Sequence, residues 1–227
     1  MKSKQNATNG QILPRARTGL ALCGLGAAAA LLLTGCGDDE PKAQPAPVTS
    51  DAQASASPSA AGLTEDQAER QRLVPAAKVD HRKAGTAAEA QVSGSTLVSA
   101  ELKRTRDGGP EWETEVAAAD GAVKKVTVNA VGGAAAQPRA DSDQDAEDRR
   151  KLASRLAGAK VTWEKAATTA NGRKQGTVTA VELDDDDKAG GKPVWKVDVV
   201  TPGNWDKTTY EIDAADGTVV REHVDRD

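Results

Sequence analysis

An apolar framework that starts near residue 79 recurs 81 to 84 residues further along the chain. In the first copy the framework residues are Val79, Ala84, Gly94, Glu101, Leu102, Trp112, Val116, Val126 and Val128. In the second copy, in the same order, they are Val161, Ala166, Gly176, Glu182, Leu183, Trp195, Val199, Tyr210 and Ile212. A framework repeated at this distance predicts two copies of one small domain rather than one large fold. Domains of this size leave little room for a large enclosed active site.

The first 35 residues have the pattern of a bacterial export signal. Residues 1–19 carry four basic side chains and no acid, and residues 20–33 are apolar but too short to span a bilayer, which takes about 20 residues. The run ends in Leu33-Thr34-Gly35-Cys36, which resembles the lipobox, whose cysteine receives a diacylglyceryl group and becomes the new N-terminus. We therefore expect a signal peptide over 1–35 and lipidation of Cys36. The alternative is a buried apolar helix with an incidental cysteine.

Removal of the signal would change both the thiol content and the charge of the chain. Cys23 would be lost and Cys36 acylated, so thiol catalysis, cysteine-based zinc sites and redox function are excluded. Loss of four basic side chains takes the formal net charge from −4 to −8. An acidic domain is a poor candidate for binding nucleic acid. The acyl chains would instead hold the protein at the outer face of the bacterial cytoplasmic membrane.

The rest of the first half is expected to contain a tether and the first domain. Residues 36–62 are rich in Ala, Pro and Ser and read as a flexible tether. Thr64 and Gln67 form a capping box for a helix that Pro75 stops, and Asp80 caps a helix to about residue 91. Strands are expected at 96–103, 111–117 and 123–129, because apolar and charged residues alternate there. The first domain then covers 63–133.

The pattern restarts after a linker at residues 134–142. Helices are expected at 145–156 and 163–171, and strands at 177–183, 194–200, 208–213 and 218–222, so the second domain covers 143–227. Each copy is a helix followed by an antiparallel meander, and the predicted fold class is α+β with two small tandem domains. Trp112 and Trp195, at equivalent positions, are the expected core anchors. Trp195, Val197 and Val199 should face the helix.

Residues 161–220 resemble a PepSY domain. The resemblance is carried by the strand sequence from Lys192 to Val199 and by the ending Asp213-Ala214-Ala215-Asp216-Gly217, which Thr218-Val219-Val220 follow. The first copy is a degenerate match, because Asn129-Ala130-Val131-Gly132-Gly133 replaces that ending. The resemblance implies a domain that binds or restrains peptidases, or regulates other proteins near the cell surface. It brings no catalytic residue with it.

Few residues in the chain are suited to catalysis or metal binding. The two histidines, His81 and His223, lie near no Gly-x-Ser-x-Gly turn and are interpreted as surface residues. The acidic run Asp184–Asp187 is interpreted as a solvated hairpin loop, with a weak cation site or a protease-sensitive tip as alternatives. We expect no catalytic residue, metal or cofactor. Trp205, after Pro202-Gly203-Asn204, is either an exposed aromatic for partner contact or a lid on the sheet edge.

These features predict an exported lipoprotein without enzyme activity, whose PepSY domains bind or regulate a peptidase or another cell-envelope protein. A passive cell-surface scaffold or sensor is the alternative, and an enzyme with an unrecognised site is a third class. An open strand edge or exposed apolar patch on the second copy would favour binding. A deep pocket with converging polar groups would favour an enzyme. An interface between the two copies, without such a patch or pocket, would favour a scaffold. The sequence does not identify the partner or the oligomeric state.

Overall fold

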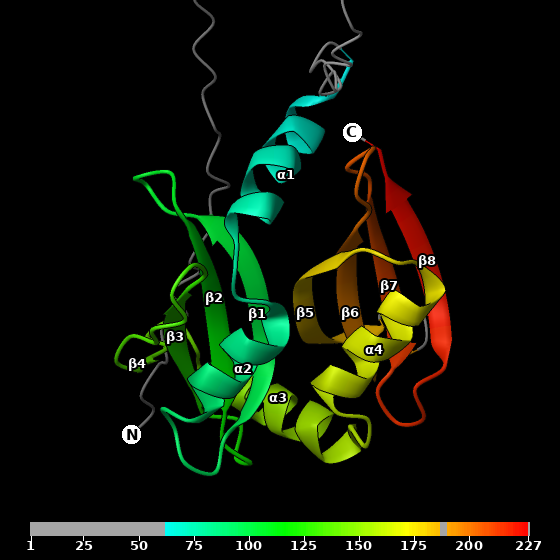
Figure 1. Cartoon of the computed structure of the whole chain (residues 1–227). Coiled ribbons are helices and arrows are strands. Elements are labelled where there is room, and N and C mark those ends of the chain that lie inside the picture. Colours follow the sequence, from blue (N-terminus) through cyan, green and yellow to red (C-terminus); the bar gives the residue numbers. More distant parts are fainter. Residues whose placement is uncertain (1–61, 187–189, 227) are drawn as a thin grey trace, which may run out of the picture. The chain divides into compact units, whose positions relative to one another are not determined.

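The computed structural model describes residues 62–186 and 190–226, so the predicted signal, Cys36 and residues 36–61 of the tether lie outside the described residues, as does Asp187. The described residues form one eight-stranded sheet in the order β4-β3-β2-β1-β5-β6-β7-β8, with every neighbouring pair antiparallel (Figure 1). Helices pack on this sheet, which confirms the α+β class. The two predicted meanders are joined by a β1–β5 pairing that the sequence analysis did not foresee.

The first repeat supplies helices α1 and α2 and strands β1 to β4. Their bounds are α1 Glu65–Ala76, α2 His81–Glu89, β1 Thr96–Arg104, β2 Pro110–Ala117, β3 Val123–Asn129 and β4 Arg139–Ala140. The capping box of α1 is present: the Thr64 hydroxyl accepts from the Gln67 amide at 3.2 Å, and the Gln67 side chain accepts from the Thr64 amide at 3.1 Å. Pro75 does not stop α1, because it lies inside the last turn.

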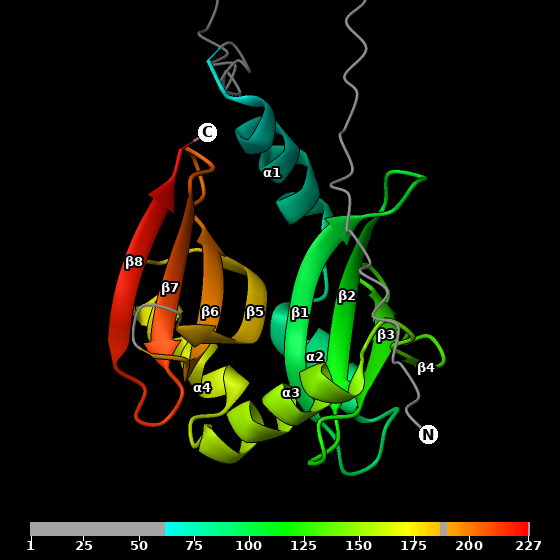
Figure 2. The ribbon, with the colours of Figure 1, turned by 180° about the vertical axis from the view of Figure 1, so that it is seen from behind.

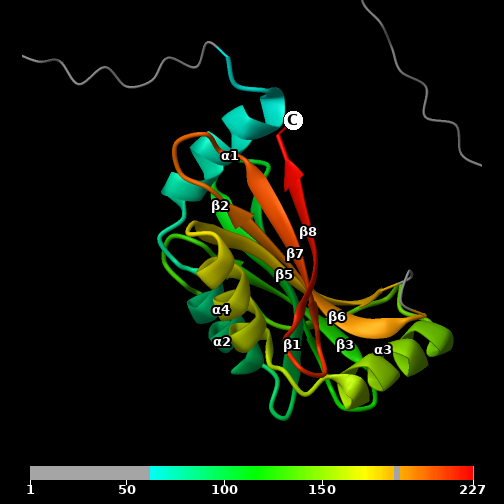
Figure 3. The same ribbon diagram turned by 90° about the vertical axis from the view of Figure 1, so that its right-hand side faces the viewer.

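The second repeat supplies helices α3 and α4 and strands β5 to β8. Their bounds are α3 Ala146–Gly158, α4 Trp163–Arg173, β5 Thr177–Asp186, β6 Lys192–Val200, β7 Lys207–Asp213 and β8 Val219–Asp225. Helices α2 and α4 cover one face of the sheet, and α3 lies on the opposite side (Figure 3). The stretch 134–142, expected as a linker, contains β4, which pairs with Lys124 and Lys125 of β3. None of the described helices is long and apolar enough for a membrane span.

The two repeats meet about an approximate two-fold axis. In the β1–β5 pairing Ala100 lies opposite Val181, its own counterpart in the other repeat. Ser99 lies opposite Glu182, and Glu101 lies opposite Ala180. The register of the pairing is therefore the same whether it is followed along β1 or along β5, as at the interface of a symmetric dimer.

The core anchors make the same hydrogen bond in both repeats. The Trp112 and Trp195 side chains are 1% and 2% exposed, as expected for anchors. The Trp112 Nε1 donates to the Val79 carbonyl at 2.8 Å, and the Trp195 Nε1 donates to the Val161 carbonyl at 2.8 Å. Buried indoles are thus satisfied by the backbone that enters α2 and α4.

The degenerate ending of the first repeat still builds the turn seen in the second. The Gly133 amide donates to the Asn129 carbonyl at 2.8 Å, and the Gly217 amide donates to the Asp213 carbonyl at 2.9 Å. Both glycines have a positive φ, 77° and 83°, which other residues rarely adopt. The first repeat therefore keeps the conformation although it has lost the sequence.

Candidate binding face

Figure 2 views the sheet from the side opposite α2 and α4, where α3 lies across part of the sheet. We call this side the open face; Glu113, Glu115, Lys196 and Asp198 lie on it. In β6, Trp195, Val197 and Val199 are buried while Lys196 and Asp198 are half-buried on the other side, as the alternation predicted. The same pattern in β2 puts Glu113 and Glu115 on the open face. Because side chains of a strand point alternately to the two faces of the sheet, the charged ones form a solvent-accessible surface that extends over both repeats.

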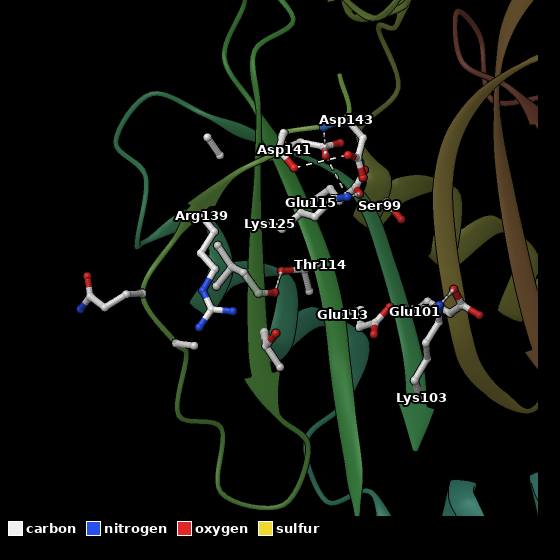
Figure 4. A pocket seen from close by; sticks show the side chains of 16 residues that line it. Ser99, Glu101, Lys103, Glu113, Thr114, Glu115, Lys125, Arg139, Asp141 and Asp143 are labelled. Atoms are coloured by element: carbon white, nitrogen blue, oxygen red, sulfur yellow. Dashed lines mark hydrogen bonds and ion pairs between the residues drawn. The ribbon is translucent and has the colours of Figure 1, made fainter. Parts of the chain in front are cut away.

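A groove of about 540 Å³ lies on the first repeat's part of the open face (Figure 4). Strands β1, β2 and β3 form its floor, and residues 136–143 form its rim. The Lys103 ammonium lies 3.0 Å from carboxylate oxygens of both Glu101 and Glu113. These two contacts raise the pKa of Lys103. Lys103 therefore stays charged near neutral pH and cannot act there as a general base.

A second set of charged residues links the floor of the groove to its rim. The Lys125 ammonium lies 3.0 Å from an Asp141 oxygen and 3.8 Å from a Glu115 oxygen. The Lys125 contact lowers the pKa of Asp141, whereas burial raises the pKa of Glu115. Burial, with repulsion from Asp184, also raises the pKa of Glu182. Glu115 and Glu182 are thus two carboxylates of the open face whose charged form desolvation disfavours.

The acidic run is part of strand β5, so its interpretation as a solvated loop is wrong for the three described residues. Asp184 pairs with Lys196, and Asp185 lies 2.6 Å from Arg155 of α3. Asp186 is buried, and its Oδ1 lies 3.3 Å from the Arg221 guanidinium. Cations from α3, β6 and β8 neutralise these carboxylates, which is why the strand can continue through them. The sequence could not show this, because the cations are distant along the chain.

Trp205 lies in the β6–β7 connection, away from the residues that line the groove. It is half-buried and has a φ of 61°, an unusual value for a bulky residue. Its amide donates to the Thr201 carbonyl at 3.0 Å, and the next residue, Asp206, is held by the Gln67 amide group at 3.0 Å. The loop is therefore fixed by α1, while partner contact by Trp205 stays a prediction.

The two histidines lie in different environments. His223 is exposed on β8, as expected. His81 is half-buried rather than fully exposed: it packs edge-on against Trp163, with ring centroids 6.4 Å apart. Burial lowers the pKa of His81 to about 4, and its Nε2 has no hydrogen-bond partner among the described residues. Neither histidine lines the groove.

Sequence reasoning missed two residues that organise the molecule. Trp163 was assigned only to a helix start, yet it is 2% exposed and contacts the other repeat. Gln67 was assigned only to a capping box, yet its amide also bonds Asp206 and the Arg226 carbonyl. The one available signal was Trp163 itself, a large apolar residue where the first repeat has His81.

Comparison with known proteins assigns the second repeat to a family. Residues 160–223 match the family model "Peptidase propeptide and YPEB domain", named PepSY. No curated protein matches the chain. Among solved structures, a Clostridium difficile 630 protein described as a "putative lipoprotein" aligns with 18% identity over 66% of this chain and 95% of that one, at a TM-score of 0.40. YpmB of Bacillus subtilis aligns with 13% identity over 65% and 100%, at a TM-score of 0.28. Residues 160–223 of this chain are a PepSY domain.

Proposed function

We propose that this chain is an exported lipoprotein, held on the membrane through Cys36, whose PepSY domain binds and regulates a peptidase or another cell-envelope protein. The chain acts by binding rather than by catalysis. The family match over residues 160–223 supports a peptidase-related role for the second repeat. The paired lysines of the groove, which stay protonated near neutral pH, fit a surface for polar contact better than a catalytic site.

One observation carries the proposed mode of binding: β8 is the outermost strand of the sheet on the side of the PepSY domain. It pairs with β7, and no further described strand lies beyond it. Val220 stands at an irregularity of the β7–β8 pairing and is 46% exposed. An extended segment of a partner can add to such an edge, with main-chain hydrogen bonds supplying affinity.

The edge is tested with two matched substitutions. Val220 of β8 and Val131 of the first repeat's turn are the two exposed large apolar residues of the described chain, at 46% and 54%. A lysine at an edge opposes strand addition. After crosslinking on membranes, Val220→Lys should reduce recovery of the envelope partner about ten-fold or more, a loss of about 1.4 kcal/mol in binding. Val131→Lys should leave recovery unchanged. Equal recovery from both variants would exclude the β8 edge.

The anchor is tested separately. Cys36→Ala removes the only acceptor for the diacylglyceryl group in the proposed mature chain, so the protein should leave the membrane fraction or accumulate as an unprocessed precursor. Fractionation followed by intact-mass measurement distinguishes these products from the acylated form. A Cys36→Ala protein that stays acylated and membrane-held would refute the lipoprotein assignment.

A passive scaffold is the second candidate, and the contact between the two repeats favours it. A scaffold needs no enzyme partner, because its domains bind each other. If crosslinked wild-type protein captures no peptidase or other envelope enzyme, the scaffold becomes the better reading.

A further inference from the structure

Trp163 of α4 packs into a notch on α2 of the other repeat. A Cβ atom built on Gly85 would lie 2.7 Å from Cη2 and 2.8 Å from Cζ2 of the Trp163 ring. The Trp163 Nε1 donates to Glu89 Oε1 at 3.2 Å, and the ring meets His81 edge-on. His81, Gly85 and Glu89 follow one another at intervals of four, so they share one face of α2. Gly85 lies between His81 and Glu89 on that face, and its missing Cβ leaves the space that the ring occupies.

This contact breaks the two-fold symmetry of the repeats. With Val79 equivalent to Val161 and Ala84 to Ala166, His81 is the counterpart of Trp163, and Gly85 is the counterpart of Ala167. If two PepSY domains met in the same way, Ala167 would stand where Gly85 stands. Its Cβ would then come within 3 Å of a Trp163 ring, a distance that real Cβ atoms essentially never show. The fit therefore favours pairing of a first repeat with a PepSY domain over pairing of two PepSY domains.

The backbone contact points to the same pairing. Strand β5 is the first strand of the PepSY domain, and its outer edge is covered by β1 through the pairing of Ala100 with Val181 and its two flanking pairs. Without β1, this edge would offer unpaired amides and carbonyls to another chain. The first repeat thus covers two surfaces of the PepSY domain together, the β5 edge and the ring of Trp163.

We propose that the first repeat is a built-in partner of the PepSY domain, which occupies its β5 edge and its Trp163 face and, through the notch at Gly85, disfavours pairing between two PepSY domains. This inference concerns the β5 side of the domain and does not depend on the proposed function at β8. It predicts that a filled notch separates the two repeats and exposes the β5 edge and the Trp163 face.

The first test is a substitution cycle on the full-length protein. Gly85→Ala should lower the midpoint of thermal unfolding by about 3–10 °C, since overpacking of this kind typically costs enough for such a shift. Gly172→Ala is the matched control, because Gly172 lies in α4 with nothing within 4 Å of the added Cβ; it should leave the midpoint unchanged or raise it. In a Trp163→Ala background, Gly85→Ala should lose most of its penalty, because only Leu97 Cδ2, at 3.1 Å, remains among the three nearest atoms to the added Cβ. An equal effect of Gly85→Ala in both backgrounds would show that the penalty does not come from the Trp163 ring, and would refute the proposed contact.

The second test measures release of the surface. Gly85→Leu should raise hydrogen exchange in residues 96–104 and 177–186 relative to the wild type, whereas Gly172→Ala should leave this exchange unchanged. If Gly85→Leu stays folded with β1 and β5 still protected, the first repeat is not a partner that holds this surface. If Gly85→Leu fails to fold, the milder Gly85→Ala and its controls decide the question alone.

Discussion

At the scale of single residues, His81 couples the molecule to pH. Burial against Trp163, opposed by Asp80 and aided by Arg82, lowers its pKa from 6.5 to about 4. The unfolded chain therefore binds the His81 proton first as the pH falls, so stability is full above about pH 6.5 and declines towards pH 4. We expect the free energy of unfolding to drop by about 2 kcal/mol between pH 7 and pH 5.

Urea unfolding at these two pH values measures the drop, and His81→Gln should remove most of it. His223→Gln is the control, because His223 is exposed on β8. The same pH dependence in wild type and His81→Gln would place its origin in other groups.

At the scale of elements, α1 is held mainly by polar contacts. Gln67 bonds Asp206 and the Arg226 carbonyl, Arg70 lies 3.3 Å from Asp225, and Leu73 contributes partial apolar burial. Gln67→Ala should therefore increase hydrogen exchange in residues 65–76 about ten-fold, the equivalent of a lost buried hydrogen bond, while α4 stays protected. Gln71→Ala, one turn on, should not. Unchanged exchange in Gln67→Ala would mean that other contacts hold α1.

The elements also show how far the sequence could lead. Alternation of apolar and charged residues predicted the strands and their buried faces. The sequence also predicted the anchors Trp112 and Trp195 and the helix caps Thr64 and Asp80, because these signals are local. The end of β5 was placed too early, since Asp184 to Asp186 remain in a strand only with cations from α3, β6 and β8. The groove was not foreseen either, because its rim at 136–143 looked like a linker.

At the scale of the whole molecule, the two repeats share one sheet and one cluster of buried apolar side chains. We therefore expect a single cooperative unfolding transition in calorimetry, with equal calorimetric and van't Hoff enthalpies. Two independent domains would instead unfold in two steps. Gly85→Leu, which opens the contact between α2 and α4, should broaden or split the transition. The joining of the repeats was invisible in the sequence, because it rests on two edges brought together by folding.

The place of α1 has a mechanical consequence. The chain enters the described structure at residue 62, and α1 is the first element that it reaches. Although α1 belongs to the first repeat in sequence, its Gln67 bonds Asp206 and its Arg70 pairs with Asp225, both in the second repeat. A pull on the N-terminal side would therefore load the hairpin of the PepSY domain before it loads β1 to β3. The Gln67–Asp206 bond lies on that path, and neither residue takes part in the strand pairing of either meander.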